Sequence, residues 1–347
     1  MSTDTQERHR RILLSTATGP GDAVTTALVA SLGTEATLRA ARGEFIPGLG
    51  TWPAMSILAW REQITPRLDE SSVDRVLDAC ALGGLRVVVP GDTDWPTGID
   101  DLAAVPLVLY VRGDASLMAR PLNAKAAIVG TTGGTGDGDF LAQQTVAELT
   151  ADGFTIVSGA SIGIEAAAQR AALAAGGASI AVLAGGLNRR YPEEHQRLID
   201  AIAANGAVAS ELPPGATPTR WRFLQRGRII AAMSAATVVV EAGRDSGALN
   251  IAAHARHIGR PVAAYPGSGS GTASEGTREL IANSVARLVA SGAEVREIID
   301  ADPRPIFEAG ASAEPVPRTV LRRDALADFS AVSHDSSPRR PVPGPSL

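Results

Sequence analysis

TVVVEA (237–242) is one of seven short apolar segments that decide the fold of this chain. The other six are AAIVG (126–130), FTIVSG (154–159), SIAVLAGG (179–186), AVASE (207–211), PVAAYPG (261–267) and ARLVA (286–290). None of them alternates polar and apolar residues, and helical stretches separate them. This pattern predicts an α/β fold whose parallel sheet is buried on both faces. Such a sheet binds its ligand outside the carboxyl ends of the strands, so functional residues are expected directly after each segment.

The composition allows a large core but gives no overall sign of a nucleic-acid partner. The chain has 347 residues, 45% of them apolar, and its formal net charge is −5. An anion-binding role would therefore need a local basic patch. Arginine supplies nearly all of the basic side chains, because Lys125 is the only lysine.

The N-terminus and the cysteine content predict a cytoplasmic protein without a membrane segment. The first residues, MSTDTQERHRR, are polar, and the apolar stretch at 12–17 is too short for a signal sequence. Cys80 is the only cysteine, which excludes an intrachain disulfide and a cysteine-rich zinc site. A single thiol also fits a reducing cytosol.

Three segments are expected along the chain. Residues 1–90 form a small helical domain, because apolar residues recur there at helical spacing in Ile12–Leu14, Ala23–Leu32, Thr34–Ala41 and Val73–Leu82. Residues 91–302 hold the sheet, and PLVLYVRG (106–113) is a further strand-like segment. Residues 303–347 are rich in Pro and Ser and are expected to be disordered.

Glycine-rich turns follow the first two predicted strands. After Gly130 the chain continues with TTGGTGDGD (131–139), and such a turn into a helix presents N–H groups that can hold a phosphate. The glycine spacing is not GxGxxG, so a plain tight turn explains it equally well. In the second turn, SGASIGIE (158–165), Glu165 either stabilises the helix start or contacts a ligand.

The most basic stretch is TRWRFLQRGR (219–228), which interleaves four arginines with two aromatics. On a helix, Arg222 and Arg226 lie on one face. Arginines contact phosphates, and aromatic rings can stack on unpaired bases. We expect at least one of these arginines to bind an anion, and we expect Trp221 and Phe223 to be core anchors.

The turn after TVVVEA contains EAGRDSGA (241–248). Ser246 is expected to cap the next helix. Glu241 is either a pocket acid or base or the acceptor of a structural hydrogen bond. His254 and His257 follow at i, i+3 with no carboxylate at matching spacing, so they are interpreted as ordinary helix residues.

The chain contains no Ser/His/Asp arrangement, Walker-type GKT, HExxH or CxxC, which predicts a protein without catalysis or a cofactor. Two weaker signals remain at the junctions. Arg189 and Arg190 are either solvated or a phosphate contact. Pro266 and Gly267 begin a Gly/Ser loop expected at the mouth of the crevice.

Taken in order, these junctions resemble the DprA (Smf) family of DNA-processing proteins of natural transformation. The family pattern is a Gly-Ser-Arg turn, SGxAxGID, YP, SE, FPxRNRIIAGLS, VVEAxxxSGSLITA, GR and a VPG turn. The matching stretches here are Gly130–Thr132, SGASIGIE, Tyr191-Pro192, Ser210-Glu211, FLQRGRIIAAMS (223–234), VVEAGRDSGALNIA (239–252), Gly259-Arg260 and Tyr265–Gly267. The resemblance implies an extended Rossmann-like, doubly wound, mostly parallel sheet with a small N-terminal helical domain.

Several polar positions of the family pattern are replaced. Thr132 stands at the family's Arg, Glu165 at the Asp of GID, Gln169 at a His, Gly227 at the Asn of RNR, Ile251 at the Thr of LITA and Arg278 at a late Asn. The Pro-rich tail replaces the family's usual winged helix. The chain therefore resembles a divergent member of the family.

The resemblance implies a non-catalytic protein that binds single-stranded DNA, usually as a homodimer, and helps to load a RecA-type recombinase. Arg226 and Arg228 keep the family positions and are the expected DNA or anion contacts, with Arg222, Arg244 and Arg278 as further cations. The turns expected to line the pocket contain Gly130, Thr131, Thr132, Ser158, Gly159, Gly163, Glu165, Glu241, Ser246, Gly247, Pro266 and Gly267. The hypothesis requires the guanidinium groups of Arg226 and Arg228 to converge on one cationic groove.

Two alternatives stay open. Phosphoribohydrolases similar to lysine-decarboxylase-like proteins share this architecture, so a nucleotide-binding or nucleotide N-glycoside-hydrolysing protein is the second hypothesis. Its candidate acids are Glu241 and Glu165, although EAGRDSGALN (241–250) lacks the last Glu of that group's PGGxGTxxE. The third hypothesis is a scaffold that keeps the fold and acts through protein contacts.

Overall fold

The computed structural model describes residues 5–188, 191–267 and 271–301, which belong to one compact unit. The expectations for Arg189, Arg190 and the tail at 303–347 lie outside these residues. Within the described ranges, no helix is long and apolar enough to cross a membrane. The division of the chain at residue 90 stays a prediction.

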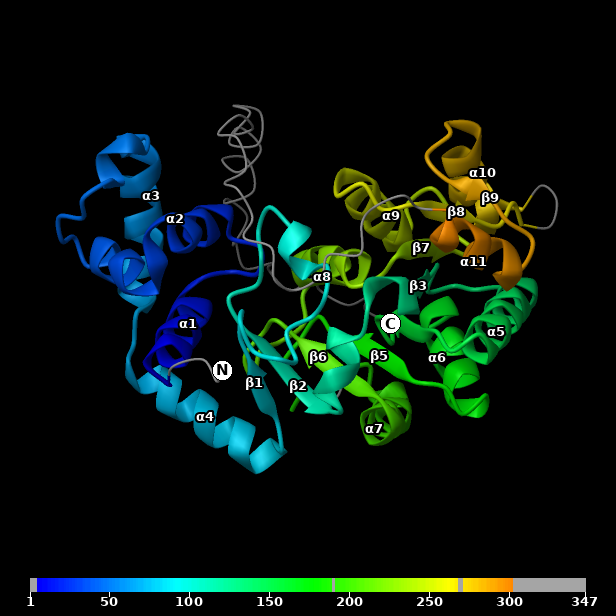
Figure 1. The fold of residues 1–347 in the computed structure, drawn as a ribbon, viewed down its shortest axis with the longest axis horizontal. Coiled ribbons are helices and arrows are strands. Elements are labelled where there is room, and N and C mark those ends of the chain that lie inside the picture. The colour runs from blue at the N-terminus through cyan, green and yellow to red at the C-terminus, as the bar shows by residue number, and fades with distance from the viewer. Residues whose placement is uncertain (1–4, 189–190, 268–270, 302–347) are drawn as a thin grey trace, which may run out of the picture. The chain divides into compact units, whose positions relative to one another are not determined.

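In the described part of the chain, nine strands form a single sheet in the order β1-β2-β6-β5-β4-β3-β7-β8-β9 (Figure 1). Neighbouring strands from β6 to β9 are parallel, whereas β2 is antiparallel to both β1 and β6. The strands are β1 (Arg86–Val88), β2 (Leu109–Gly113), β3 (Lys125–Val129), β4 (Thr155–Ser158), β5 (Ser179–Val182), β6 (Ala207–Ser210), β7 (Ala236–Val239), β8 (Val262–Ala264) and β9 (Arg287–Leu288). Each of the seven apolar segments overlaps one of the strands β3–β9, which confirms the predicted sheet.

Helices cover both faces of the sheet, which is why the strands carry no polar alternation. One face packs on α8 (Arg220–Ala232) and α9 (Gly247–His257). The other packs on α5 (Gly136–Ala151), α6 (Ile164–Ala174) and α11 (Gly292–Asp300). In the strands β3 to β8 successive residues point to opposite faces, yet every residue is buried. This is the doubly wound arrangement that the sequence predicts.

The N-terminal region contains α1 (Thr5–Ala17), α2 (Ala23–Ala41), α3 (Ala54–Ile64) and α4 (Ser71–Gly83). Gly33 interrupts α2 with non-helical dihedral angles (φ 83°, ψ 166°), at the point where the sequence predicts a break. The helix α3 and the strand β1 were not predicted. Both elements are short, and β1 has only one fully buried residue in three, so it lacks the apolar run that marks the other strands.

The strand order reverses at β3, which pairs with β4 on one side and with β7 on the other. Loops that leave the carboxyl ends of β3, β4 and β7 therefore meet at a topological switch point. The helices α7 (Gln196–Asn205) and α10 (Glu275–Ala282) follow β5 and β8. This edge of the sheet is where a ligand site is expected.

Lys125 is fully buried at the start of β3, at the opposite edge of the sheet. Its Nζ donates to Thr97 Oγ1 at 2.6 Å and to the carbonyl oxygen of Met118. Burial, followed by the charges of Arg260 and Arg120, lowers the pKa of Lys125 from 10.5 to about 7. Below pH 7 the folded protein bears the full cost of the buried charge.

Between pH 7 and 10.5 the unfolded chain binds more protons at this lysine, so stability rises with pH. We expect the free energy of unfolding to increase from pH 7 to pH 8.5 by up to about 1.4 kcal/mol per pH unit. The measurement stops at pH 8.5 because Cys80 has a pKa of 9.0 in the unfolded chain and about 11 in the folded protein. Above pH 8.5 the unfolded thiol begins to lose its proton, which lowers stability and opposes the effect of Lys125. Urea titrations of the wild type and of Lys125→Met measure the effect, and equal pH slopes in the two proteins would contradict it.

Candidate functional site

The loops after β3 and β7 are held together by Glu241, at the carboxyl end of β7. Its carboxylate accepts hydrogen bonds from Thr135 N–H at 2.8 Å and from Thr135 Oγ1 at 2.9 Å, and its own carbonyl accepts from Thr131 N–H at 2.7 Å. Glu241 is buried. Of the two roles considered for this residue, the structural hydrogen bond is the one observed.

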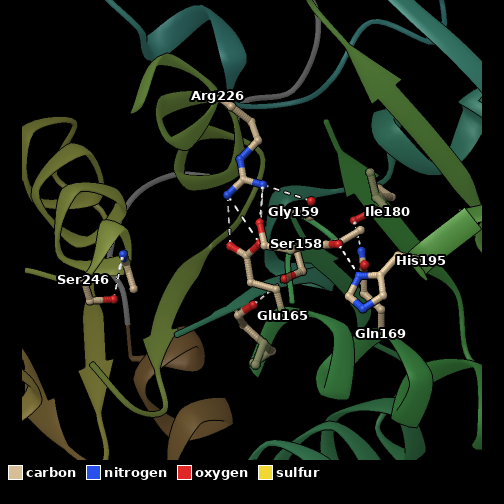
Figure 2. A network of polar contacts seen from close by, with 12 residues as sticks. Ser158, Gly159, Glu165, Gln169, Ile180, His195, Arg226 and Ser246 are labelled. Atoms are coloured by element: carbon tan, nitrogen blue, oxygen red, sulfur yellow. Dashed lines mark hydrogen bonds and ion pairs between the residues drawn. The ribbon is translucent and has the colours of Figure 1, made fainter. Parts of the chain in front are cut away.

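The turn after β4 is built around a buried ion pair between Arg226 of α8 and Glu165 of α6 (Figure 2). Nη2 of Arg226 lies 3.1 Å from Oε1 of Glu165, and the two side chains are only 7% and 4% exposed. Nη1 of Arg226 also donates to the carbonyl of Gly159 at 2.9 Å and to Ser161 Oγ at 3.2 Å. The guanidinium thus joins α8 to the whole turn.

Two glycines of this turn allow the close approach. A Cβ on Gly159 would lie 1.9 Å from Nη1 of Arg226, so any side chain there would displace the guanidinium. Gly163 has a φ of 82°, and a Cβ there would lie 2.4 Å from the carbonyl oxygen of Thr131. The hydroxyl of Ser158, at the end of β4, donates to the carbonyl of Ile128 in β3 at 2.7 Å.

Arg228, two residues along α8, is directed to a different loop. Its Nη2 lies 2.6 Å from Oε1 of Glu211, just after β6, and its side chain is 5% exposed. Its Nε lies near Gly21, in the loop between α1 and α2. The expectation that Arg226 and Arg228 converge on one cationic groove is therefore corrected, because each guanidinium is buried against its own carboxylate.

The other predicted cations are more accessible. Arg244, after β7, is 72% exposed and lies 3.1 Å from Glu275. Arg222 and Arg278 are partly exposed and donate to the carbonyls of Thr217 and Gly271. Arg220, at the start of α8, is exposed. These arginines follow β6, β7 and β8 and form a set that we call the arginine rim: Arg220, Arg222, Arg244 and Arg278.

A narrow crevice that the sequence did not predict opens beside the Arg226–Glu165 pair. Its walls come from the ends of β4 and β5 and from the start of α8: Gly159, Ser161, Leu183, Ala184, Gly185, Gly186, Tyr191, Pro192, Pro218 and Phe223. The rings of Tyr191 and Phe223 are 5.8 Å apart and tilted by 58°, and Arg226 lies 5.4 Å from the centre of the Phe223 ring. The signals that could have found it are the Gly185-Gly186 and Tyr191-Pro192 pairs.

Two aromatic side chains at this edge are exposed, Tyr191 by 51% and Trp221 by 50%. The expectation that Trp221 is a core anchor is therefore wrong, whereas Phe223 is partly buried. Periodicity could not separate them, because Trp221 lies in the first turn of α8, before the helix reaches the core.

The remaining predicted pocket residues lie in the turns after their strands. Ser246 caps α9 by accepting from Ala248 N–H, as predicted. Gly130, Thr131 and Thr132 follow β3, Gly247 begins α9, and Pro266 and Gly267 follow β8. The described residues contain no group of three His, Cys, Asp or Glu side chains that could hold a metal ion.

Two of the replaced positions touch each other. A Cβ on Gly227 would lie 3.0 Å from Cγ1 of Ile251 and 3.2 Å from Oδ1 of Asn250. The branched side chain of Ile251 therefore occupies the space beside α8 that a longer residue at 227 would need. Burial and the charge of Arg228 lower the pKa of the neighbouring His254.

Comparison with known proteins gives a consistent result. The family model of DNA recombination-mediator protein A matches residues 86–300. A DprA protein of Mycobacterium tuberculosis is 38% identical over 282 residues, which cover 77% of this chain and 70% of that protein. The DNA processing protein DprA of Bacillus subtilis is 34% identical over 207 residues, which cover 60% of this chain and 67% of that protein.

Two solved structures share the fold. The DprA structure from Streptococcus pneumoniae superimposes with a TM-score of 0.67 at 26% identity, over 85% of this chain and 98% of that one. The DNA processing protein A of Helicobacter pylori, whose structure is described as revealing a single-stranded DNA binding mode, gives a TM-score of 0.55 at 28% identity. That match covers 61% of this chain and 94% of the other.

The buried pair predicts a large effect of Arg226 on stability. We expect Arg226→Ala to lower the free energy of unfolding by about 3–5 kcal/mol, because Glu165 is left buried without its partner. Urea denaturation at pH 7 measures this loss. Removing both charges in Arg226→Met/Glu165→Gln should restore most of it.

The control is Arg244→Ala, which breaks an exposed pair and should change stability by less than about 1 kcal/mol. A loss in Arg226→Ala no larger than in Arg244→Ala would show that the Arg226–Glu165 pair is not structural. Weak DNA binding by Arg226→Ala has to be judged against this folding defect.

Proposed function

The chain belongs to the DNA recombination-mediator protein A family, and on that premise we propose that it is a non-catalytic recombination accessory protein that binds single-stranded DNA. The structure of the Helicobacter pylori protein is described as having a single-stranded DNA binding mode, and it shares its fold with 61% of this chain. The observation that carries the proposal is the arginine rim at the carboxyl edge of the sheet, whose two members in α8 lie beside two exposed aromatic rings.

The arginine rim supplies the charge for phosphate binding. Its members come from the loops and helices after β6, β7 and β8, so they share the carboxyl edge of the sheet, on which β5, β4 and β3 lie between β6 and β7. Exposed guanidiniums can exchange a surface carboxylate or carbonyl for a phosphate at little cost, because such surface pairs contribute little to stability. Arg226 and Arg228 would pay a far larger cost, because they are buried.

Exposed aromatic rings supply the second element of the surface. Tyr191 and Trp221 lie at the end of β5 and the start of α8, next to the arginines of α8. Base stacking on such rings is worth about 1–3 kcal/mol per base and tolerates any sequence. The proposed surface therefore binds the strand without strong base preference.

The engagement of Glu241 and Glu165 supports a non-catalytic function. Both carboxylates are buried: Glu241 accepts two hydrogen bonds from Thr135, and Glu165 accepts from the Ser161 N–H and from Arg226. A hydrolase of nucleotide N-glycosides would need an acid directed at the bond to be cleaved. These two residues, the candidate acids of that alternative, instead hold the pocket together.

The resemblance to the family extends the proposal to its partners. We propose a homodimer that loads a RecA-type recombinase in the cytoplasm, with residues 1–90 as a helical domain, 91–302 as the sheet domain and 303–347 as the tail. A protein that mediates recombination must hold the strand and still release it. Exposed, salt-sensitive contacts suit that requirement better than buried ones.

Titration of a fluorescent dT20 oligonucleotide against NaCl tests the proposal. The wild type should bind at low salt, and log K should fall with log salt by about 0.7 for each phosphate neutralised. Arg222→Ala/Arg244→Ala should bind more weakly, and its slope should be smaller by about 1.4. Fluorescence anisotropy measures both quantities.

The matched control removes two exposed, paired arginines outside the rim, in Arg75→Ala/Arg86→Ala. Its net charge equals that of the rim variant, so it should keep the wild-type affinity and slope if the rim is the binding surface. Absence of wild-type binding at low salt would end the proposal. An equal loss in both double variants would show that only the overall charge matters.

A further inference from the structure

Ala160, in the turn after β4, has a left-handed backbone conformation with a φ of 55°. A residue other than glycine adopts this conformation at a cost in free energy, so the surrounding structure has to hold it in place. The methyl group of Ala160 is fully buried in the core that also contains Leu198 of α7. A glycine at 160 would avoid the cost but would leave this space empty.

The carbonyl oxygen of Ala160 lies 2.9 Å from Nδ1 of His195. Because a carbonyl oxygen only accepts hydrogen bonds, Nδ1 carries a proton and donates it. His195 is 5% exposed and ends a short 3-10 helix, Glu193–His195, directly before α7. The bond is therefore a buried contact between two segments that lie 35 residues apart in the sequence.

Two buried side chains hold the turn from the two faces of the sheet. Arg226 comes from α8, which packs on one face, and donates to the carbonyl of Gly159. His195 comes from the start of α7, which packs together with Ala160 on the other face. Figure 2 shows Arg226 and His195 on different sides of the turn. The carbonyls of two successive residues are thus each held by a side chain from a different helix.

The bond of His195 also joins two walls of the crevice. The residues on either side of Ala160 line one wall, and Tyr191 and Pro192 line another. The backbone N–H of His195 donates to the carbonyl of Pro192 at 3.1 Å. Tyr191 comes directly before Pro192, and its half-exposed ring lies 5.8 Å from the ring of Phe223. The position of this ring therefore depends on the anchor that His195 provides.

We propose that His195 is a positioning residue that holds the exposed ring of Tyr191 in place for base stacking. Its imidazole anchors the segment that carries Tyr191 to the turn after β4, and it keeps Ala160 in its left-handed conformation. His195 is buried, so it acts through Tyr191 and does not touch the DNA strand. The DNA-binding part of the test rests on the proposed function, whereas the hydrogen-exchange part does not.

Hydrogen exchange measured by mass spectrometry tests this anchor without DNA. His195→Leu fills the space in an apolar core and removes the donor. It should speed amide exchange in both joined segments, residues 158–165 and 191–198, by about fivefold or more, because one buried hydrogen bond is lost. His195→Asn should keep most of the protection, since its amide can donate to the same carbonyl. Unchanged exchange in either segment of His195→Leu would overturn the proposal.

The dT20 titration tests what the anchor does for binding. His195→Leu should bind dT20 about fivefold or more weakly than the wild type, the lower bound for one lost base stack. Tyr191→Ala should lose as much, and adding His195→Leu to it should weaken binding little further, because both changes act through one ring. Two losses that add in full would contradict the proposal.

His195→Asn keeps the experiment decisive even where His195→Leu does not fold. Because this variant retains a donor for the carbonyl of Ala160, it should bind dT20 nearly as tightly as the wild type. A loss in folded His195→Asn as large as that in Tyr191→Ala would also overturn the proposal.

Gln169→Leu is the matched control. Nε2 of Gln169 donates to the carbonyl of Ile180 at 3.2 Å, and the side chain is fully buried but does not line the crevice. The control therefore loses a similar buried bond and should keep the wild-type affinity for dT20. Equal losses in Gln169→Leu and His195→Leu would show that only stability matters. If the wild type binds no dT20 but exchange rises in both segments of His195→Leu, the proposed function fails and the anchoring of Tyr191 by His195 stands.

Discussion

The turn after β4 depends on a charge pair that has been taken out of water. Burying Arg226 and Glu165 costs each side chain its hydration, and their mutual attraction offsets that cost only when the remaining donors are also used. The carbonyl of Gly159 and the hydroxyl of Ser161 accept hydrogen bonds from Nη1 of Arg226, which leaves only its Nε without an acceptor among the described residues. The turn, α6 and α8 are thereby held in one geometry. The pair thus positions the crevice, the start of α8 and the loops around the switch point.

Buried arginine–carboxylate pairs also occur elsewhere in the fold, so several basic residues have a structural role. Arg228 pairs with Glu211, and Arg260 pairs with Asp101 at 2.5 Å, so helices and loops from distant parts of the chain are joined by buried arginines. Arg226 and Arg228, the two residues that the sequence assigned to DNA first, are thereby used for structure. The arginines of the rim differ from these: Arg220 and Arg244 are exposed, and Arg222 and Arg278 are partly exposed.

The sheet was predictable because each of its central strands is apolar throughout, a pattern that burial on two faces imposes. β1 was missed because it lies at the edge and buries one residue in three. The fate of Arg226 was not predictable from spacing, since its partner Glu165 is 61 residues away and meets it only through the packing of α8 on the β4 turn. The sequence shows where the arginines are. Whether an arginine side chain is buried depends on where the fold places its partner carboxylate.

The replaced positions make physical sense once their contacts are known. Ile251 fills the space beside Gly227, so an apolar contact stands where the family pattern has two polar side chains. Thr132 removes a cation of that pattern, while Glu165 keeps a carboxylate against Arg226, so the pocket loses positive charge without losing its shape. The glycines of the turn are retained because a side chain has no room at either position. A Cβ on Gly159 would collide with the guanidinium of Arg226, and one on Gly163 would collide with the carbonyl of Thr131. Backbone geometry and pocket charge have therefore changed independently in this chain: the turn keeps its shape, while its charge differs from that of the family pattern.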